Sequence, residues 1–191
     1  MEINSISVRI LPETLDYDGS QISPLWAYSI GIPGNSIVVF RGAMDIPDAN
    51  MKDLEDLQNH KAIKGGDLLH FIVERFDSPA SMRVAYFMQR MLVVCARDVM
   101  AQHGIGSERN GDDLFVGTGK LTVSIATAGI SSEKVHFGIN ISCEGTPPDV
   151  RVACLDSLGI TDAMGLAREI ASAFAREMDD IESDIVKTRP L

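Results

Sequence analysis

Residues 109–142, RNGDDLFVGTGKLTVSIATAGISSEKVHFGINIS, contain two runs in which apolar and polar side chains alternate. Such alternation is typical of β-strands, because successive side chains point to opposite faces. Folding residues 120–128 and 134–142 back about residues 130–132 predicts an antiparallel hairpin with two different faces. The predicted apolar face carries Leu121, Val123, Ile125, Val135, Phe137, Ile139 and Ile141. The predicted polar face carries Lys120, Thr122, Ser124, His136, Gly138 and Asn140. This polar face is either a solvated surface or the floor of a binding site.

Length and composition indicate one globular domain. The chain has 191 residues, 45% of them hydrophobic and 23% charged, so residues 1–191 are predicted to form a single domain with a sizeable core. The formal net charge of −10 argues against general binding to nucleic acids, which requires clustered lysine and arginine. No apolar run approaches the roughly 20 residues of a membrane span, and the first residues lack the apolar core of a signal peptide. We therefore expect neither membrane insertion nor general nucleic-acid binding.

The cysteines suggest a reducing compartment. Cys95, Cys143 and Cys154 are odd in number and widely spaced, and they form no C-x-x-C motif. This pattern predicts neither a disulfide framework nor a zinc ribbon. A cytoplasmic location therefore fits best.

The rest of the chain is predicted to contain both strands and helices. Residues 44–66 show little periodicity and predict a long loop, which in a compact domain is either functional or mobile. Residues 67–76, DLLHFIVERF, predict a buried helix. The other predicted strands are residues 3–11, 36–40 and 150–155. The other predicted helices are residues 21–28, residues 79–103 after a cap at Asp77, and a final helix capped by Thr161.

Polar residues outside the hairpin provide further candidates. Arg41 and Asp45 directly follow the strand at residues 36–40, where a sheet edge often meets a ligand; the alternative is a strand end that meets water. His70 and Glu74 are spaced i, i+4, so they share one face and could pair or both touch a metal. Two residues do not make a metal site, and a hydrogen-bonded structural pair is the favoured interpretation. The spacing of these two residues identifies no particular metal.

The motifs of residues 109–142 resemble those of the catalytic domain of biotin and lipoate protein ligases. That family carries a W-P-N-D-L segment, a glycine-bearing turn, K-L or K-I, a strand, a turn and G-I-N-V. The corresponding residues here are DDLF at 112–115, GTG at 117–119, KL at 120–121 and GINI at 138–141. The resemblance implies an α+β fold with a mixed, mostly antiparallel sheet and packed helices, like that of class II aminoacyl-tRNA synthetases.

The whole chain also resembles a small archaeal and bacterial family of unknown function, the domain-of-unknown-function family three-six-six, placed within the same fold. Its shared segments are GD-x-LHFIVE, GDDL, K-L-x-VSIAT and HFG-x-NI. They correspond here to residues 66–74, 111–114, 120–127 and 136–141. This resemblance implies the same fold and brings no established reaction.

The ligase resemblance implies roles for the polar hairpin residues. Lys120 would hold the carboxylate of an acid and the phosphate of its adenylate, because a mobile cation can follow charge that is shared among several oxygens. Asp113 and Asp112 would contact the substrate or help to hold Mg²⁺, and ATP would be the second substrate. Arg41 would be a second clamp for phosphate or carboxylate, and Asn140 would fix a polar group of the ligand. Further candidates for ligand contact are Ser124, Asp45 and His70.

The chain also departs from the ligases. It has neither the Gly-Arg-rich adenylate loop of biotin ligases nor the Gly-Gly-Gly segment of lipoate ligases, and the positional counterpart is residues 41–43, RGA. Two hypotheses therefore stand. The first is an ATP-dependent ligase or acyltransferase that activates a small carboxylic acid through an adenylate. The second is a non-catalytic small-molecule-binding or assembly protein that keeps the fold without the adenylate-forming loop. In both, the partner is a small ligand with a carboxylate or phosphate, and the fold would suit a homodimer.

Overall fold

The computed structural model describes residues 6–191, and this range adopts an α+β fold. The main sheet consists of β1 (Ser7–Thr14), β2 (Ser36–Asp45), β3 (Lys64–Phe76), β7 (Thr122–Ala128) and β8 (Ser132–Asn140). These strands lie in the order β1-β2-β3-β8-β7. β1 runs parallel to β2, and the other neighbouring strands are antiparallel. The predicted fold class, a mixed and mostly antiparallel sheet with packed helices, is confirmed.

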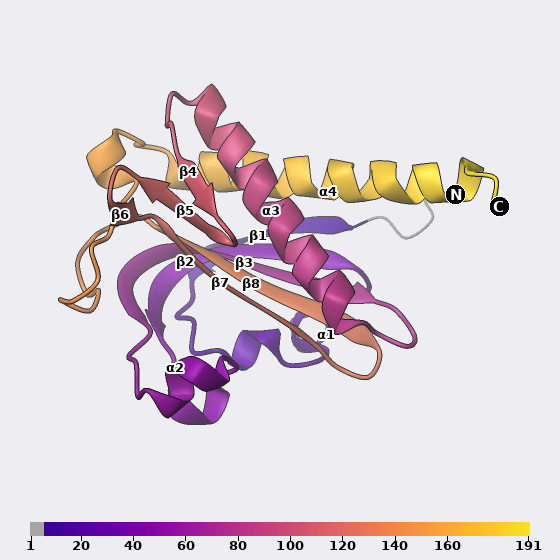
Figure 1. Cartoon of the computed structure of the whole chain (residues 1–191), viewed down its shortest axis with the longest axis horizontal. Coiled ribbons are helices and arrows are strands. Elements are labelled where there is room, and N and C mark those ends of the chain that lie inside the picture. Colours follow the sequence, from indigo (N-terminus) through magenta and orange to yellow (C-terminus); the bar gives the residue numbers. More distant parts are fainter. Residues whose placement is uncertain (1–5) are drawn as a thin grey trace.

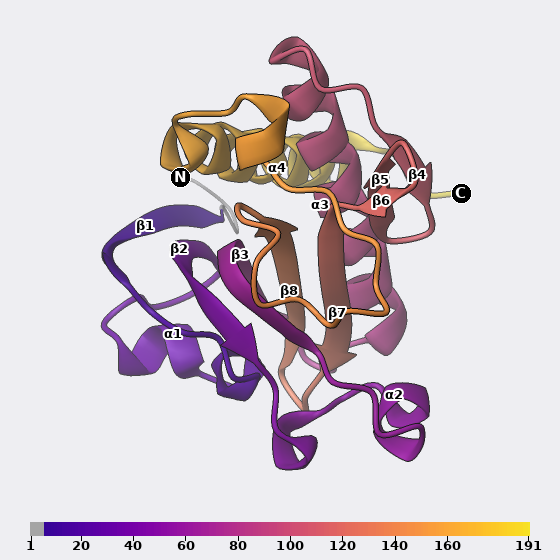
Figure 2. The same cartoon turned by 90° about the vertical axis from the view of Figure 1, so that its left-hand side faces the viewer.

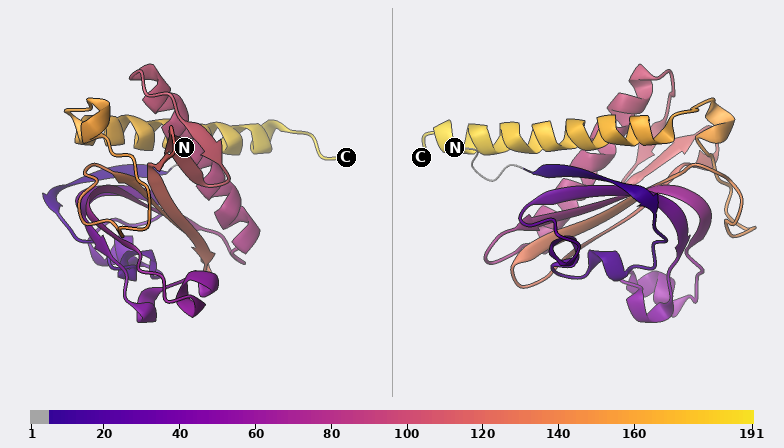
Figure 3. Two further views of the ribbon diagram at one scale, coloured as in Figure 1. Left: turned by 60° about the vertical axis from the view of Figure 1, so that its left-hand side comes forward. Right: turned by 180° about the vertical axis from the view of Figure 1, so that it is seen from behind.

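Two long helices, α3 (Met82–Gln102) and α4 (Ala163–Lys187), cover one face of the main sheet, which we call the helix face (Figure 1). The opposite face, which we call the open face, lies toward α1 (Trp26–Ser29) and α2 (Leu54–Gln58) (Figure 3). A second, smaller sheet consists of β4 (Glu108–Asn110), β5 (Asp113–Val116) and β6 (Gly119–Lys120). Figure 2 shows the long loop between β8 and α4 passing along the ends of β7 and β8. Within the described residues, no helix is long and apolar enough to cross a membrane.

Alternate side chains of the central strands build a core on each face of the sheet. On the helix face, Phe71 and Phe137 pack with their ring centroids 5.7 Å apart, beneath the buried Phe174 of α4. On the open face, Phe40 and Leu68 are fully buried together with short apolar segments of the chain. β3 is therefore covered on both faces and bonded on both edges.

The helix predicted at residues 67–76 is wrong, because this segment belongs to β3. β3 pairs with β2 on one edge and with β8 on the other. A short apolar run is compatible with either a buried helix or a central strand, so its periodicity alone could not distinguish them. In a strand, His70 and Glu74 still share a face, and that face is the open face.

The predicted antiparallel hairpin is confirmed, but its predicted register is wrong by one residue. Val123 pairs with Gly138 and Ile125 pairs with His136, so these two apolar side chains lie on the open face. The prediction placed them on one apolar face with Val135, Phe137 and Ile139, which the structure places on the helix face. A shift of one residue moves every side chain of a strand to the other face of the sheet. Ser124 consequently points toward α3.

Several predicted boundaries also differ. The first strand continues past Pro12 to Thr14, which an edge strand tolerates; residues 3–5 of the prediction lie outside the described residues. The helix predicted at 21–28 is a 3₁₀ turn, Ser20–Ile22, followed by the single turn of α1. Ser81 and Asp162, whose side chains accept backbone hydrogen bonds, cap α3 and α4, rather than Asp77 and Thr161.

Residues 150–155 form only a bridge between Val152 and Lys120. The loop predicted at 44–66 contains α2 and the 3₁₀ turn Asp48–Asn50, and the ends of β2 and β3 extend into it.

Candidate functional site

Two small cavities lie side by side over the open face. The first, of about 110 Å³, is lined by Lys120 and Asn140 among others, and we call it the lysine cavity. The second, of about 60 Å³, is lined by Tyr17 and His136 among others, and we call it the histidine cavity. Ile63 and Val123 line both cavities. A ligand larger than either cavity would therefore meet both.

Lys120 is placed at the lysine cavity by a tight turn between β5 and β6. Only residues 117–118 separate the two strands. Gly117 has a φ of 58°, which this kind of hairpin turn requires and glycine adopts readily. A side chain at Gly119 would lie 2.8 Å from backbone atoms of Val152, so the glycine lets the following loop pass close by.

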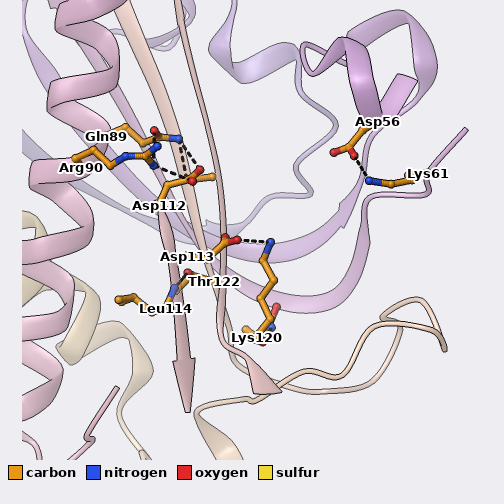
Figure 4. A network of polar contacts seen from close by, with 11 residues as sticks. Asp56, Lys61, Gln89, Arg90, Asp112, Asp113, Leu114, Lys120 and Thr122 are labelled. Atoms are coloured by element: carbon orange, nitrogen blue, oxygen red, sulfur yellow. Dashed lines mark hydrogen bonds and ion pairs between the residues drawn. The ribbon is translucent and has the colours of Figure 1, made fainter. Parts of the chain in front are cut away.

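The Lys120 ammonium forms an ion pair with Asp113, and the two side chains point toward each other (Figure 4). The Nζ–Oδ2 distance is 2.9 Å, and the side chains are 34% and 26% exposed. Burial raises the pKa of Asp113 and outweighs the opposing effect of Lys120. Because burial makes the charged form of Asp113 costly, the ammonium of Lys120 is suited to exchange this carboxylate for the anionic group of a ligand.

Asn140 fixes the backbone around Lys120. Its Nδ2 donates to the carbonyl oxygens of Lys120 and Ala153, at 3.2 Å each. The backbone of Lys120 also donates to Arg151 O at 2.9 Å and accepts from Ala153 N at 3.0 Å. Asn140 therefore lines the lysine cavity and holds the lysine-bearing segment against the loop.

Asp112 belongs to a polar network with Gln89 and Arg90 on the α3 side of the sheet (Figure 4), and Ser124 is part of the same network. Arg90 forms an ion pair with Asp112 at 2.8 Å, while Ser124 Oγ and Gln89 Nε2 donate to the same carboxylate at 2.8 and 3.0 Å. Burial would raise the pKa of Asp112, but the bonds from Ser124 and Arg90 outweigh it and lower the pKa. The network anchors the segment that leads into β5.

Arg41 and Asp45 lie apart from the two cavities. Arg41 forms an ion pair with Asp67 and borders a groove between β1 and α4. Asp45 forms an exposed ion pair with Lys64 at 3.1 Å. The segment at residues 41–43, the positional counterpart of the ligases' adenylate loop, is part of β2. The structure thus brings Lys120, Asp113 and Asn140 together and leaves Arg41 elsewhere.

His70 and His136 form a buried pair beneath the histidine cavity. Nδ1 of His70 lies 3.0 Å from Nε2 of His136, and Nε2 of His70 lies 3.1 Å from Gly42 O. Tyr17 stacks on His136 with 3.6 Å between ring centroids and 9° between planes. Burial lowers the pKa of His70 to about 4, and burial followed by the His70 charge lowers the pKa of His136 well below its ordinary value. Both rings are therefore neutral at pH 7.

Glu74 does not pair with His70 but forms a buried ion pair with Lys134, at 2.5 Å. Glu74 also accepts from Leu25 N at 3.1 Å and from Ser132 Oγ at 3.0 Å, and Lys134 donates to Ser23 O at 2.8 Å. These contacts attach the α1 region to the open face. The favoured interpretation of His70 and Glu74 as one hydrogen-bonded pair is wrong, because each bonds to a residue of β8.

Cys143 and Cys154 form a disulfide bond, so the prediction of no disulfide is wrong. They are eleven residues apart in sequence, and the loop between them, whose Thr146, Pro147 and Val152 line the lysine cavity, brings them together. Cys95 is a buried free cysteine on α3. The spacing of the cysteines carried no signal for this pairing.

The carboxylates near Lys120 do not fit a Mg²⁺ site. No group of three or more His, Cys, Asp or Glu side chains in residues 6–191 could hold a metal ion. Both oxygens of Asp112 already accept from donors, and Asp113 faces Lys120.

Sequence reasoning missed two contributors to the cavities. Tyr17 lies outside every predicted strand and helix, yet its ring is buried against His136. Ile63 was predicted to lie in a loop and instead forms a wall shared by both cavities. Neither residue stands in a pattern that would have revealed its position.

Comparison with known proteins identifies the family. The family described as domain of unknown function DUF366 matches residues 6–189. The chain belongs to this family. Uncharacterized protein MJ0805 of Methanocaldococcus jannaschii is 42% identical over 191 residues, a match that covers 97% of this chain and 86% of that protein. A solved structure from Pyrococcus horikoshi, described as a protein of unknown function, is 38% identical with a TM-score of 0.93, over 98% of this chain and 100% of the other.

More distant structures share the fold. Biotin protein ligase from Aquifex aeolicus, in complex with biotin and ATP, has a TM-score of 0.60 at 10% identity, covering 95% of this chain and 73% of that chain. Ta0514 from T. acidophilum, a putative lipoate protein ligase, has a TM-score of 0.57 at 14% identity, covering 91% and 86%. At these identities the likeness concerns the fold alone, and it confirms the predicted ligase-like architecture.

Proposed function

We propose that this DUF366 protein binds a small carboxylic acid on the open face of its sheet, with Lys120 as the contact for the carboxylate. The carrying observation is the placement of a partly exposed lysine, paired with Asp113, at the wall of a cavity with apolar sides. Ligand pockets typically combine apolar walls with a few convergent polar groups. The apolar walls suit the hydrocarbon part of an acid, and the ammonium suits its charged end.

ATP-dependent activation of the acid is the second candidate. The spacing between Asp113 and Lys120 and the fold shared with a biotin ligase that binds ATP support it. Residues 41–43 argue against it, because they lie in a paired strand and Arg41 is bound to Asp67. The ligases' glycine-rich loop has no counterpart there, so binding without catalysis is our primary proposal. A homodimer and a cytoplasmic location remain predictions.

The experiment is a thermal-shift screen with octanoate, lipoate, biotin and ATP. Calorimetry then measures the affinity of each compound that stabilises the protein. Replacing Lys120 with alanine removes a charged hydrogen bond worth about 1.5–3 kcal/mol, so affinity for the acid should fall about 10- to 150-fold. Lys187→Ala is the matched control, because Lys187 forms an exposed ion pair with Asp184 at the end of α4.

The two candidates give different results in this screen. An acid that binds without ATP, and whose binding ATP does not change, supports the binding protein. Release of pyrophosphate from ATP in the presence of the acid supports activation. If no acid binds, or if Lys120→Ala and Lys187→Ala bind the acid equally well, the proposal fails.

A further inference from the structure

The hydrogen-bond chain through the two buried histidines fixes which ring nitrogens carry protons. Gly42 O can only accept, so Nε2 of neutral His70 carries the proton and donates to it. Nδ1 of His70 is then an acceptor, and Nε2 of His136, 3.0 Å away, must be its donor. Nδ1 of neutral His136 is therefore left as a hydrogen-bond acceptor.

This acceptor has no donor among residues 6–191, although the ring is 1% exposed. His136 lies at the floor of the histidine cavity, and Tyr17, stacked on the ring, lines the same cavity. The Tyr17 hydroxyl is also buried without a hydrogen-bond partner in the described part of the chain. Buried polar groups normally have partners, so the Tyr17 hydroxyl beside an acceptor without a donor calls for an explanation.

Most of the other polar side chains that line the histidine cavity are already engaged, while the exposed Lys52 lies at its rim. Asp53 caps α2 by accepting from Glu55 N and Asp56 N, and Asp56 pairs with Lys61. The remaining walls are largely apolar, with Ile22 and Ile125 among them. Between these walls the cavity presents the uncharged acceptor of His136 and the unpaired hydroxyl of Tyr17.

We propose that the histidine cavity binds an uncharged group with an N–H or O–H donor, which bonds to Nδ1 of His136. A carboxylate or phosphate placed at Nδ1 of His136 would set one acceptor against another. A purely hydrocarbon group would leave Nδ1 of His136 buried and unpaired, which disfavours it about 10- to 100-fold.

If Lys120 binds a carboxylate, as the proposed function on which this step rests has it, one ligand can contact both Lys120 and His136. Asn140, which holds Lys120, lies four residues from His136 along β8, or about 13 Å at the rise of a strand. The Lys120 side chain extends toward the ligand and shortens the distance that the ligand has to span. A ligand that reaches both sites is therefore an acid with a chain on the order of 10 Å long. At its far end it carries an amide, lactam or hydroxyl group.

The first test uses fragments without a carboxylate, so it does not depend on Lys120. The probes are 2-pyrrolidinone and cyclopentanone, which have rings of the same size and differ by one N–H group. Nitrogen NMR of the labelled full chain should show a shift of His136 Nδ1 with 2-pyrrolidinone and none with cyclopentanone. The shift should persist in Lys120→Ala. Equal responses to the two probes, or no response of His136 Nδ1 to either, would overturn the proposal.

The second test uses whole acids, suberamate with a terminal amide and nonanoate of similar length without one. The wild type should bind suberamate about 10- to 100-fold more tightly, and His136→Phe should abolish the preference by removing the acceptor while keeping a ring. His136→Gln, which keeps an acceptor, should retain part of the preference, and circular dichroism checks the fold of both variants. Unchanged preference in His136→Phe contradicts the histidine site. Unchanged affinity in Lys120→Ala contradicts the carboxylate site instead, so the two failures are distinct.

Discussion

Replacing Lys134 with methionine would leave the carboxylate of Glu74 without its counterion in the open-face core. Both side chains are 1% exposed, and burial lowers the pKa of Lys134 despite the opposing effect of Glu74. Removing one partner of a buried ion pair typically costs about 3–5 kcal/mol, because the remaining charge has lost its counterion and cannot reach water. We expect Lys134→Met to lower the free energy of unfolding by about that amount.

A second substitution distinguishes the ion pair from a simple packing effect. Glu74→Gln in the Lys134→Met background removes the stranded charge, while the new amide oxygen can still accept from Leu25 N and Ser132 Oγ. The double variant should therefore unfold within about 2 kcal/mol of the wild type, well short of the summed costs of the single changes.

The assay is urea unfolding followed by the fluorescence of Trp26, the one tryptophan of the chain, which belongs to the α1 region attached by this ion pair. Lys64→Met is the control, because it breaks an exposed ion pair with Asp45 and should change stability little. A cost below about 1 kcal/mol for Lys134→Met would refute the argument that this pair is shielded from water.

Three further predictions concern stability. The pKa of His70 is about 4 in the folded state against 6.5 in the unfolded chain, so between these pH values only the unfolded state binds the proton. The contribution of neutral His70 to the free energy of unfolding should therefore be complete above pH 6.5 and lower by about 3 kcal/mol at pH 4. Urea unfolding at several pH values measures this fall, which should be shallower in a His70→Asn variant. Cys143→Ser should cost about 2–3 kcal/mol by removing the cross-link of an eleven-residue separation, as measured by urea unfolding, and no cost in non-reducing buffer would contradict the disulfide. Gly42→Ala would bring a Cβ within 2.1 Å of Leu15 O, so the melting temperature of this variant should fall sharply. A Cβ at Gly34 would meet no atom within 4 Å, so the melting temperature of Gly34→Ala should fall less. Similar falls in the two variants would contradict the close approach at Gly42.

The hairpin at residues 120–142 could be predicted because its alternation is local, whereas its exact pairing could not. The tight turn at residues 129–132, closed by a hydrogen bond from Gly129 N to Ser132 O, sets the register. Val123 and Ile125 then face the open side, where they pack against the apolar cluster that includes Phe40 and Leu68. Those partners come from distant strands that the alternation of the hairpin does not reveal.

β3 shows the opposite difficulty. Its sequence is apolar on both faces because the strand is central, and this removed the alternation that would have distinguished it from a helix. The same error concealed the pairing of His70 with His136 and of Glu74 with Lys134, since both depend on β3 lying beside β8.

The candidate site was predictable in part. Lys120, Asp113 and Asn140 were found from a motif within one short stretch of chain, and the structure brings these three together. Arg41 was included because it follows a strand, but the direction of its side chain depends on the pairing of β2, which turns it toward Asp67. Residues that reach the cavities from remote segments, such as Tyr17, could not be found in this way.

The central claim is that an acid binds on the open face beside Lys120, and a crystal structure of the full chain grown with octanoate tests it most directly. The account predicts the octanoate carboxylate within about 3 Å of Lys120 Nζ, the distance of a charged hydrogen bond, with the hydrocarbon chain against Val123 and Ile63. Octanoate bound instead in the groove beside Arg41, or an empty open face at a concentration that saturates binding in solution, would contradict it.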